Sequence, residues 1–352
     1  MFKGGVQKQQ QQQQLQTNTI VGVNLNNVSD SSNNSSFAFP SGWDFETTYD
    51  LIVNNNATNA YRHYSSFSPN QSSIIELRNM ITTATAAQHN VVKLLADMVR
   101  NRLHDAVNLL EITSKDPVIQ NMTFAKFITK KYMGIPANID VQKRRIAQDI
   151  VARDKDTRNI YFLTPNADVY FGEPFSDQQQ LPKLNYADRD WYKGVTATNN
   201  TYISSVFMSA SIHAPAIAIA TPVYALQANN TTITNSNTTN SHKIISGYWV
   251  GILDLRSIQG SIKNLNLTNR ERIVIVDHNG TAIADSSSAV NNNNTYSSKL
   301  EDFSYLNGVK AVRKGNAGST FEIVNGTKKL SIYQPIQLGN RYWGVILIKP
   351  VI

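Results

Sequence analysis

Residues 158–174 read RNIYFLTPNADVYFGEP, and residues 271–287 read ERIVIVDHNGTAIADSS. Each stretch holds an apolar run, a short polar turn and a second apolar run, which is the pattern of a β-hairpin. The turn of the first is PNAD, and the turn of the second is DHNG. Because the pattern occurs twice, it predicts two sheet units of similar construction.

The two units are predicted to end alike. The first continues with IAIATPVYAL at residues 217–226 and then, after a polar insert, with GYWVGILDL at residues 247–255. The second continues with KLSIYQPIQL at residues 329–338 and RYWGVILI at residues 341–348. Each pair of apolar runs indicates neighbouring strands. We therefore expect one antiparallel sheet in each unit, and a long surface loop at the polar insert, residues 227–242.

A long helix is predicted before the first sheet. The sequence SIIE at residues 73–76 is a capping box, which predicts a helix start. Apolar residues then recur at helical spacing for about 40 residues, until Pro117. Globular helices average about 11–12 residues, so this one is expected to be a coiled coil or the spine of an elongated molecule. A second helix is predicted at residues 139–154, with Val141, Ile146 and Ile150 on one face.

These elements predict an α+β fold in which a long N-terminal helix carries two antiparallel-sheet units. The first 70 residues are rich in Gln, Asn and Ser, a composition that buries too little apolar surface to fold alone. We expect residues 1–70 to form a mostly disordered tail. The spine helix is expected at residues 71–114, followed by one unit at residues 115–258 and the other at residues 259–352.

Composition excludes several kinds of function. The chain has no cysteine, which rules out disulfides, thiolate metal sites and cysteine nucleophiles. The net charge is +8, but the basic residues are scattered apart from KRR at residues 143–145, which we interpret as a solvated helix face. No nucleic-acid partner is therefore expected. No apolar run reaches the roughly 18 residues of a membrane span, since Pro215 and Pro222 interrupt the longest one.

The most unusual polar cluster is NYADRDWYKG at residues 185–194. Arg189 offers a planar fork of donors that matches a carboxylate. Trp191 and Tyr192 offer flat faces that can wall a pocket. The alternative is that Trp191 packs in a core while Arg189 pairs on the surface with Asp188 or Asp190.

Together these features resemble the double Cache domain (dCache), the extracytoplasmic sensor module of chemoreceptors and sensor histidine kinases. The resemblance covers residues 73–350 and is carried by the long helix, both hairpins and DRDWYKG at residues 188–194, followed by the strands that contain YISSVF and AIAIATPVY. It implies PAS-like units. The unit at residues 115–258 would be membrane-distal and ligand-binding, and the unit at residues 259–352 membrane-proximal.

Family members that bind amino acids carry an early Tyr, then Arg-x-Trp-Tyr, a later Tyr and a distant Asp. Arg189, Trp191 and Tyr192 match the central motif, while Leu184 stands at the early Tyr position. The resemblance further implies ligand-binding roles for three residues, of which the first falls on the later Tyr position: Phe207, Tyr202 and Asp254. The carboxylate half of an amino-acid site is thus present, and a small carboxylate without an amine fits at least as well.

The resulting hypothesis is a non-catalytic sensing module, extracellular or at the cell surface, with no cofactor and no metal. Membrane anchoring would act only through segments absent from this chain, and the long helix makes a homodimer plausible. The DHNG turn lacks the later acidic ligands of a calcium loop, so a hairpin turn is the preferred interpretation.

Two other functions stay open. Asn-x-Ser/Thr sequons, including Asn121, Asn279 and Asn325, suit an adhesive or structural cell-surface glycoprotein that keeps the fold without a ligand. A hydrolase would require Ser209, Ser211 and His213 to assemble with an acidic residue, and no nucleophile elbow surrounds them.

Overall fold

The computed structural model describes residues 71–209, 212, 214–226, 244–265, 267, 271–287 and 300–350, with side chains of the first helix from residue 85 onward. The predicted disordered tail and the predicted loop at residues 227–242 lie outside the described residues, as do Ser211 and His213.

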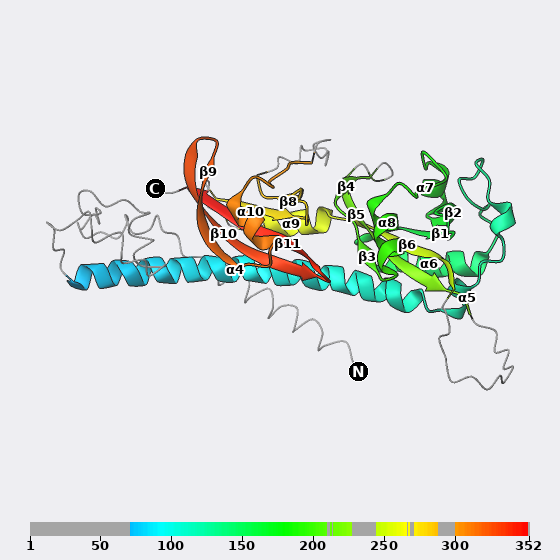
Figure 1. Cartoon of the computed structure of the whole chain (residues 1–352), viewed down its shortest axis with the longest axis horizontal. Coiled ribbons are helices and arrows are strands. Elements are labelled where there is room, and N and C mark those ends of the chain that lie inside the picture. The colour runs from blue at the N-terminus through cyan, green and yellow to red at the C-terminus, as the bar shows by residue number, and fades with distance from the viewer. Residues whose placement is uncertain are drawn as a thin grey trace, which may run out of the picture.

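The predicted spine is a single helix, α4 (Gln71–Thr113), of 43 residues. At 1.5 Å per residue it is about 65 Å long, and it runs beneath both sheets (Figure 1). Its described residues begin at Gln71, the first residue expected for the spine and two residues before Ser73 of the capping box. Its buried side chains recur at helical spacing along the side that faces the sheets: Val92, Leu95, Val99, Leu103, Ala106 and Leu110.

The first sheet is antiparallel, in the order β2-β1-β6-β5-β3, with β4 also pairing with β5. The hairpin predicted at residues 158–174 is confirmed, because β1 and β2 pair antiparallel around the PNAD turn. The strands are β1 (Thr157–Leu163), β2 (Val169–Glu173), β3 (Tyr202–Ile203), β4 (Phe207–Met208), β5 (Pro215–Tyr224) and β6 (Ile245–Asp254).

The second sheet repeats this arrangement in the order β8-β7-β11-β10-β9. In the first sheet the last strand, β6, lies between β1 and β5. In the second sheet the last strand, β11, likewise lies between β7 and β10. The α+β class and the paired units are therefore confirmed. The strands are β7 (Arg272–Val276), β8 (Ala282–Asp285), β9 (Gly318–Val324), β10 (Thr327–Leu338) and β11 (Arg341–Pro350).

Shorter helices cover the sheets and connect the strands. They are α5 (Pro117–Gln120), a 3-10 turn at Ala125–Phe127, α6 (Val141–Arg153), α7 (Phe175–Gln179), α8 (Asp190–Thr198), α9 (Arg256–Lys263) and α10 (Asn307–Val312). In Figure 1 the second sheet lies over the middle of α4, and the first sheet lies over its C-terminal end.

Alternation along the strands of the first sheet separates two apolar layers. Phe162 and Trp249 belong to the cluster that packs on α4. Tyr161 and Tyr248 belong to a second cluster on the opposite face. Strand β5 directs isoleucines toward α4 and alanines toward the other face, and these small side chains let α8 approach the sheet.

The interpretation of residues 143–145 as a solvated face was wrong for two of its three members. Lys143 and Arg144 are buried, and only Arg145 is exposed. Arg144 donates to Glu173 Oε1 at 2.7 Å and to the carbonyl of Ile135 at 2.9 Å. The predicted apolar face of α6 also differs, because Val141 is 53% exposed. The helix buries Arg144 because its guanidinium bonds the carboxylate of Glu173, a partner distant in the sequence that the local pattern cannot show.

The two sheet units also touch each other away from α4. The carboxylate of Asp277, in the DHNG turn, accepts from the backbone N–H of Val206 at 3.0 Å. Arg341, which begins β11, donates to the carbonyl of Ile203 at 2.6 Å and to the hydroxyl of Tyr202 at 2.9 Å. Since Asp277 also accepts two N–H groups within its own turn, it is the turn residue that the hairpin interpretation requires.

Candidate functional site: a cavity beside the start of helix α8

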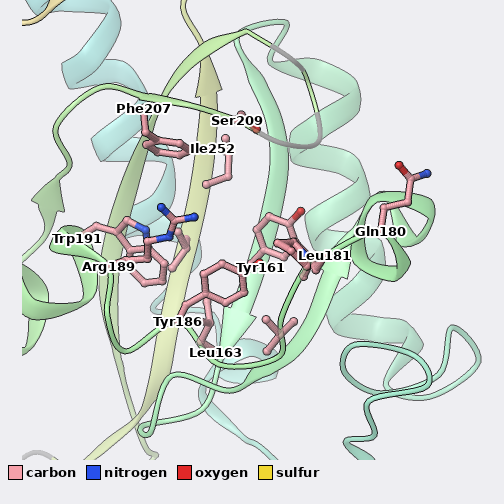
Figure 2. Close-up of a pocket in the computed structure, with 13 residues that line it drawn as sticks. Tyr161, Leu163, Gln180, Leu181, Tyr186, Arg189, Trp191, Phe207, Ser209 and Ile252 are labelled. Atoms are coloured by element: carbon pink, nitrogen blue, oxygen red, sulfur yellow. The ribbon is translucent and has the colours of Figure 1, made fainter. Parts of the chain in front are cut away.

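A cavity of about 80 Å³ lies on the face of the first sheet that points away from α4. A single water needs only about 10–15 Å³ of such space, so the cavity admits a small organic molecule. Figure 2 shows its lining side chains, which are mostly aromatic and aliphatic. They are Tyr161, Leu163, Val169, Gln180, Leu181, Pro182, Tyr186, Arg189, Trp191, Phe207, Ser209, Val250 and Ile252.

Arg189 is the only charged side chain among these lining residues. It stands at the N-cap of α8 in an extended conformation, which directs it off the helix. Its guanidinium lies 5.8 Å from the ring centre of Tyr186 and 5.8 Å from that of Phe207. Two aromatic faces thus hold a planar cation at the cavity while its donors stay available.

The alternative in which Arg189 pairs with a neighbouring aspartate does not hold among the described residues. Asp188 pairs instead with Lys183, which is the main cause that lowers the pKa of this exposed carboxyl. Asp190 accepts from the backbone N–H of Trp191 at 2.8 Å and from that of Ser205 at 2.7 Å. The guanidinium of Arg189 forms no ion pair with a described carboxylate.

Asp190 fixes the start of α8. A carboxylate in the first helical turn is favoured by the helix dipole and satisfies free N–H groups there. Its second bond, to Ser205, ties the helix start to the segment between β3 and β4. Because Arg189 directly precedes this anchor, the same contact positions the guanidinium at the cavity.

Trp191 and Tyr192 have different surroundings. Trp191 is 5% exposed, stacks on Tyr186 with ring centres 6.5 Å apart, and lines the cavity. Tyr192 does not line it. Its hydroxyl donates to the carbonyl of Pro165 at 2.7 Å, and its ring meets that of Tyr248 edge-on at 5.3 Å. Tyr192 therefore holds α8 against the β1–β2 turn.

Two further residues with predicted ligand-binding roles also lie outside the cavity lining. The ring centre of Tyr202 lies 4.0 Å from the guanidinium carbon of Arg341, at the contact between the units. Asp254 is the last residue of β6. Its carboxylate accepts from the backbone N–H of Arg256 at 2.9 Å and forms an ion pair with the Arg256 guanidinium. Of the six predicted site residues, the structure brings Arg189, Trp191 and Phe207 together at the cavity.

Tyrosines that the motif comparison did not single out also line the cavity. Tyr186 lies two positions after Leu184, and burial raises its pKa to about 12 although Arg189 opposes the shift. Tyr161 comes from the middle of β1, where sequence alternation alone could have placed it on the same face as Leu163. Leu184 packs against this apolar cluster without lining the cavity.

The described lining residues include no histidine, aspartate, glutamate or lysine, and they offer hydrogen-bonding groups and apolar walls. In the described ranges no group of three or more His, Cys, Asp or Glu side chains is placed to hold a metal ion. Within those same ranges no helix combines the length and apolar character needed to span a bilayer.

Solved structures that share this arrangement include ligand-binding domains of bacterial chemoreceptors. PctB of Pseudomonas aeruginosa PAO1, in complex with L-Arg, matches with a TM-score of 0.51 at 14% identity, over 74% of this chain and 86% of that chain. PctC of the same organism, in complex with GABA, gives 0.50 at 14%, over 74% and 96%. The domain of the Pseudomonas fluorescens chemoreceptor CtaA, in complex with L-isoleucine, gives 0.50 at 14%, over 78% and 95%.

At such identity these structures establish a shared fold and no more. No curated protein sequence gives a significant match. The sequence model of the Cache domain, in its double form, matches residues 70–351. Since that match extends over most of the chain, the chain belongs to the Cache domain family.

Proposed function

We propose that this chain is an extracytoplasmic sensing module that binds a small carboxylate or amino acid without chemical conversion. The observation that carries the proposal is the guanidinium of Arg189, which lines a cavity and has no carboxylate partner among the described residues. A bidentate bond from arginine to carboxylate is strong and directional, and the aromatic faces beside it exclude water. Family membership supports the same ligand class, as do the structural neighbours, which were solved in complex with amino acids such as L-Arg and L-isoleucine.

The lining favours a carboxylate without an amine. An amino acid needs an acidic or strongly accepting group for its ammonium, and the described lining residues include no carboxylate. Asp254, which would supply one by analogy, is engaged by Arg256. The rings of Tyr186 and Phe207 are the remaining groups that could hold an ammonium, but the guanidinium of Arg189 already lies over both rings.

A thermal-shift screen of small carboxylates and amino acids tests the proposal. A ligand at 100 times its Kd stabilises the folded state by about 2.7 kcal/mol, which raises the Tm measurably. Arg189→Ala should weaken binding about 10- to 150-fold, because hydrogen bonds to charged groups are worth about 1.5–3 kcal/mol. The Tm of the ligand-free variant should hardly change, since no described ion pair is lost.

Lys193→Ala is the matched control, because Lys193 is an exposed cation on the same helix and does not line the cavity. It should bind as the original chain does. If no carboxylate or amino acid raises the Tm, or if both variants lose affinity equally, the proposed site is wrong.

We extend the proposal to the arrangement at a membrane. The start of α4 and the end of β11 lie toward the same end of the molecule, where Lys349 donates to Gln88 at 2.9 Å (Figure 1). This geometry supports a membrane-proximal unit at residues 259–352 and a distal unit at residues 115–258. A membrane-anchored or secreted location and a homodimer that forms through α4 stay predictions. Analytical ultracentrifugation tests the homodimer.

The second candidate, an adhesive or structural glycoprotein, has one observation in its favour. The sequon residues Asn121, Asn279 and Asn325 are exposed, as glycan attachment requires. A cavity lined by a cation that has no carboxylate partner among the described residues serves no purpose in that role, so the sensing function is preferred.

A further inference from the structure

Tyr161 lies at the middle of β1 and faces the cavity. Its ladder partner on β2 is Gly172. A Cβ atom at Gly172 would come within 2.4 Å of Tyr161 Cε1, so the absence of a side chain there lets the tyrosine ring lie over the neighbouring strand. The sequence thus provides space for this ring at one specific place.

The hydroxyl of Tyr161 is buried and has no hydrogen-bond partner among the described residues. The residue as a whole is 7% exposed. Folded proteins pair nearly all such groups, because an unpaired buried hydroxyl destabilises the fold. Two other tyrosines of this unit follow the rule, since Tyr170 donates to Asp140 and Tyr192 donates to Pro165. An orphan hydroxyl that borders a cavity is explained if a bound molecule supplies the partner.

The hydroxyl remains protonated at any physiological pH. Burial is the largest cause that raises the pKa of Tyr161, and the negative charge of Asp177 acts in the same direction. A neutral phenol in this position donates a hydrogen bond to an oxygen acceptor. It therefore complements Arg189, which can bind an anion but cannot distinguish one carboxylate from another of equal size.

We propose that the Tyr161 hydroxyl is the second polar anchor of the cavity, and that the ligand is a small carboxylic acid bearing a second oxygen acceptor away from its carboxylate. Figure 2 shows Arg189 and Tyr161 standing apart among the lining residues, with apolar side chains such as Ile252 also drawn there. A molecule that spans them has an anionic end, a short apolar middle and a carbonyl or hydroxyl end. This inference rests on the proposed function, because it takes Arg189 as the carboxylate anchor.

The test uses two pairs of acids that differ by one oxygen: pentanoate with 4-oxopentanoate, and butanoate with 4-hydroxybutanoate. Calorimetry should show that the original chain binds an oxygen-bearing acid about tenfold more tightly than its hydrocarbon partner, the equivalent of one hydrogen bond. In Tyr161→Phe, which keeps the ring, that preference should disappear. The Tm of ligand-free Tyr161→Phe should stay the same or rise, because the variant removes an unpaired buried hydroxyl.

Tyr170→Phe is the matched control. It removes a hydroxyl on the opposite face of the same sheet. That hydroxyl donates to the carboxylate of Asp140 and accepts from the backbone N–H of Phe124. Its Tm should fall while its ligand preference stays unchanged. A fall in Tm for Tyr161→Phe with no change in preference would indicate a purely structural hydroxyl and overturn the inference.

The remaining outcomes separate the two claims. If the acids bind through Arg189 and the original chain shows no preference for oxygen, only the role of Tyr161 is wrong. If the preference survives in Tyr161→Phe, the role of Tyr161 is again wrong. If none of the four acids binds, the carboxylate site and this inference fail together.

Discussion

Single residues decide what the cavity can hold, and the sequence revealed them unevenly. Arg189 and Trp191 were predicted because a short motif carries them and because their chemistry is distinctive. Tyr161 was missed, since a tyrosine within an apolar strand resembles any other core residue until the three-dimensional partners of its hydroxyl are known. Asp254 was selected because the family pattern has a distant Asp, and a motif comparison cannot show that Arg256 engages it.

Gly172 provides a prediction at the residue scale. Gly172→Ala should destabilise the fold by about 1–3 kcal/mol, because the new methyl group would overlap the Tyr161 ring in a packed layer. The displaced ring should also weaken ligand binding. Urea unfolding and calorimetry measure the two effects.

Gly260→Ala is the control for this substitution. Gly260 lies within α9, and an added Cβ atom would meet nothing within 4 Å. Alanine is the better helix former by about 0.5–1 kcal/mol, so this variant should be slightly more stable. Equal destabilisation of both variants would contradict the crowding at Gly172.

Whole elements were easier to predict than the faces they bury. Helix α6 was expected at residues 139–154 and is found at Val141–Arg153. Its buried side, however, contains Lys143 and Arg144, whose partners Asp140 and Glu173 lie in the loop before α6 and in β2. Apolar periodicity assumes that charged side chains face water, an assumption that fails where a distant carboxylate is buried with them.

Adjacent arginines on α6 test this at the element scale. Arg144→Ala should destabilise the fold by about 3–5 kcal/mol, because it leaves the buried carboxylate of Glu173 without its cation. Arg145→Ala, on the exposed side, should change stability by less than about 0.5 kcal/mol. Urea unfolding of both variants makes the comparison, and similar losses would refute the buried ion pair.

The whole molecule joins its two units twice, through α4 and through the contact around the DHNG turn. The duplicated hairpin pattern predicted both sheets, yet nothing local to either unit could predict that contact. It depends on side chains far apart in the sequence, with Arg341 donating to Tyr202 and Asp277 accepting from Val206.

His278 makes this contact sensitive to pH. Arg341 donates to its Nε2 at 3.1 Å, an arrangement that requires a neutral ring. Burial is the largest cause that lowers the pKa of His278, and Arg341 and Arg313 add to it, whereas Asp277 and Asp190 oppose it. The unfolded chain, with an ordinary histidine pKa near 6.5, therefore binds the proton more readily than the folded chain.

Stability should consequently fall as the pH drops through about 6.5, and this contribution should level off once the folded protein also binds the proton. Unfolding free energies measured between pH 8 and pH 5 should show the decline. His278→Gln should reduce the slope in that window. An unchanged slope in the variant would show that another group is responsible.

The length of α4 has a consequence for synthesis on the ribosome. The middle of the helix, which carries Val92 and Leu95, packs beneath the second sheet, and that sheet is completed only when β10 and β11 have been made (Figure 1). The apolar side of a segment translated early thus waits for partners translated last. A nascent chain stopped before Thr327 would keep that side open to chaperones, so the order of translation runs against the order of packing.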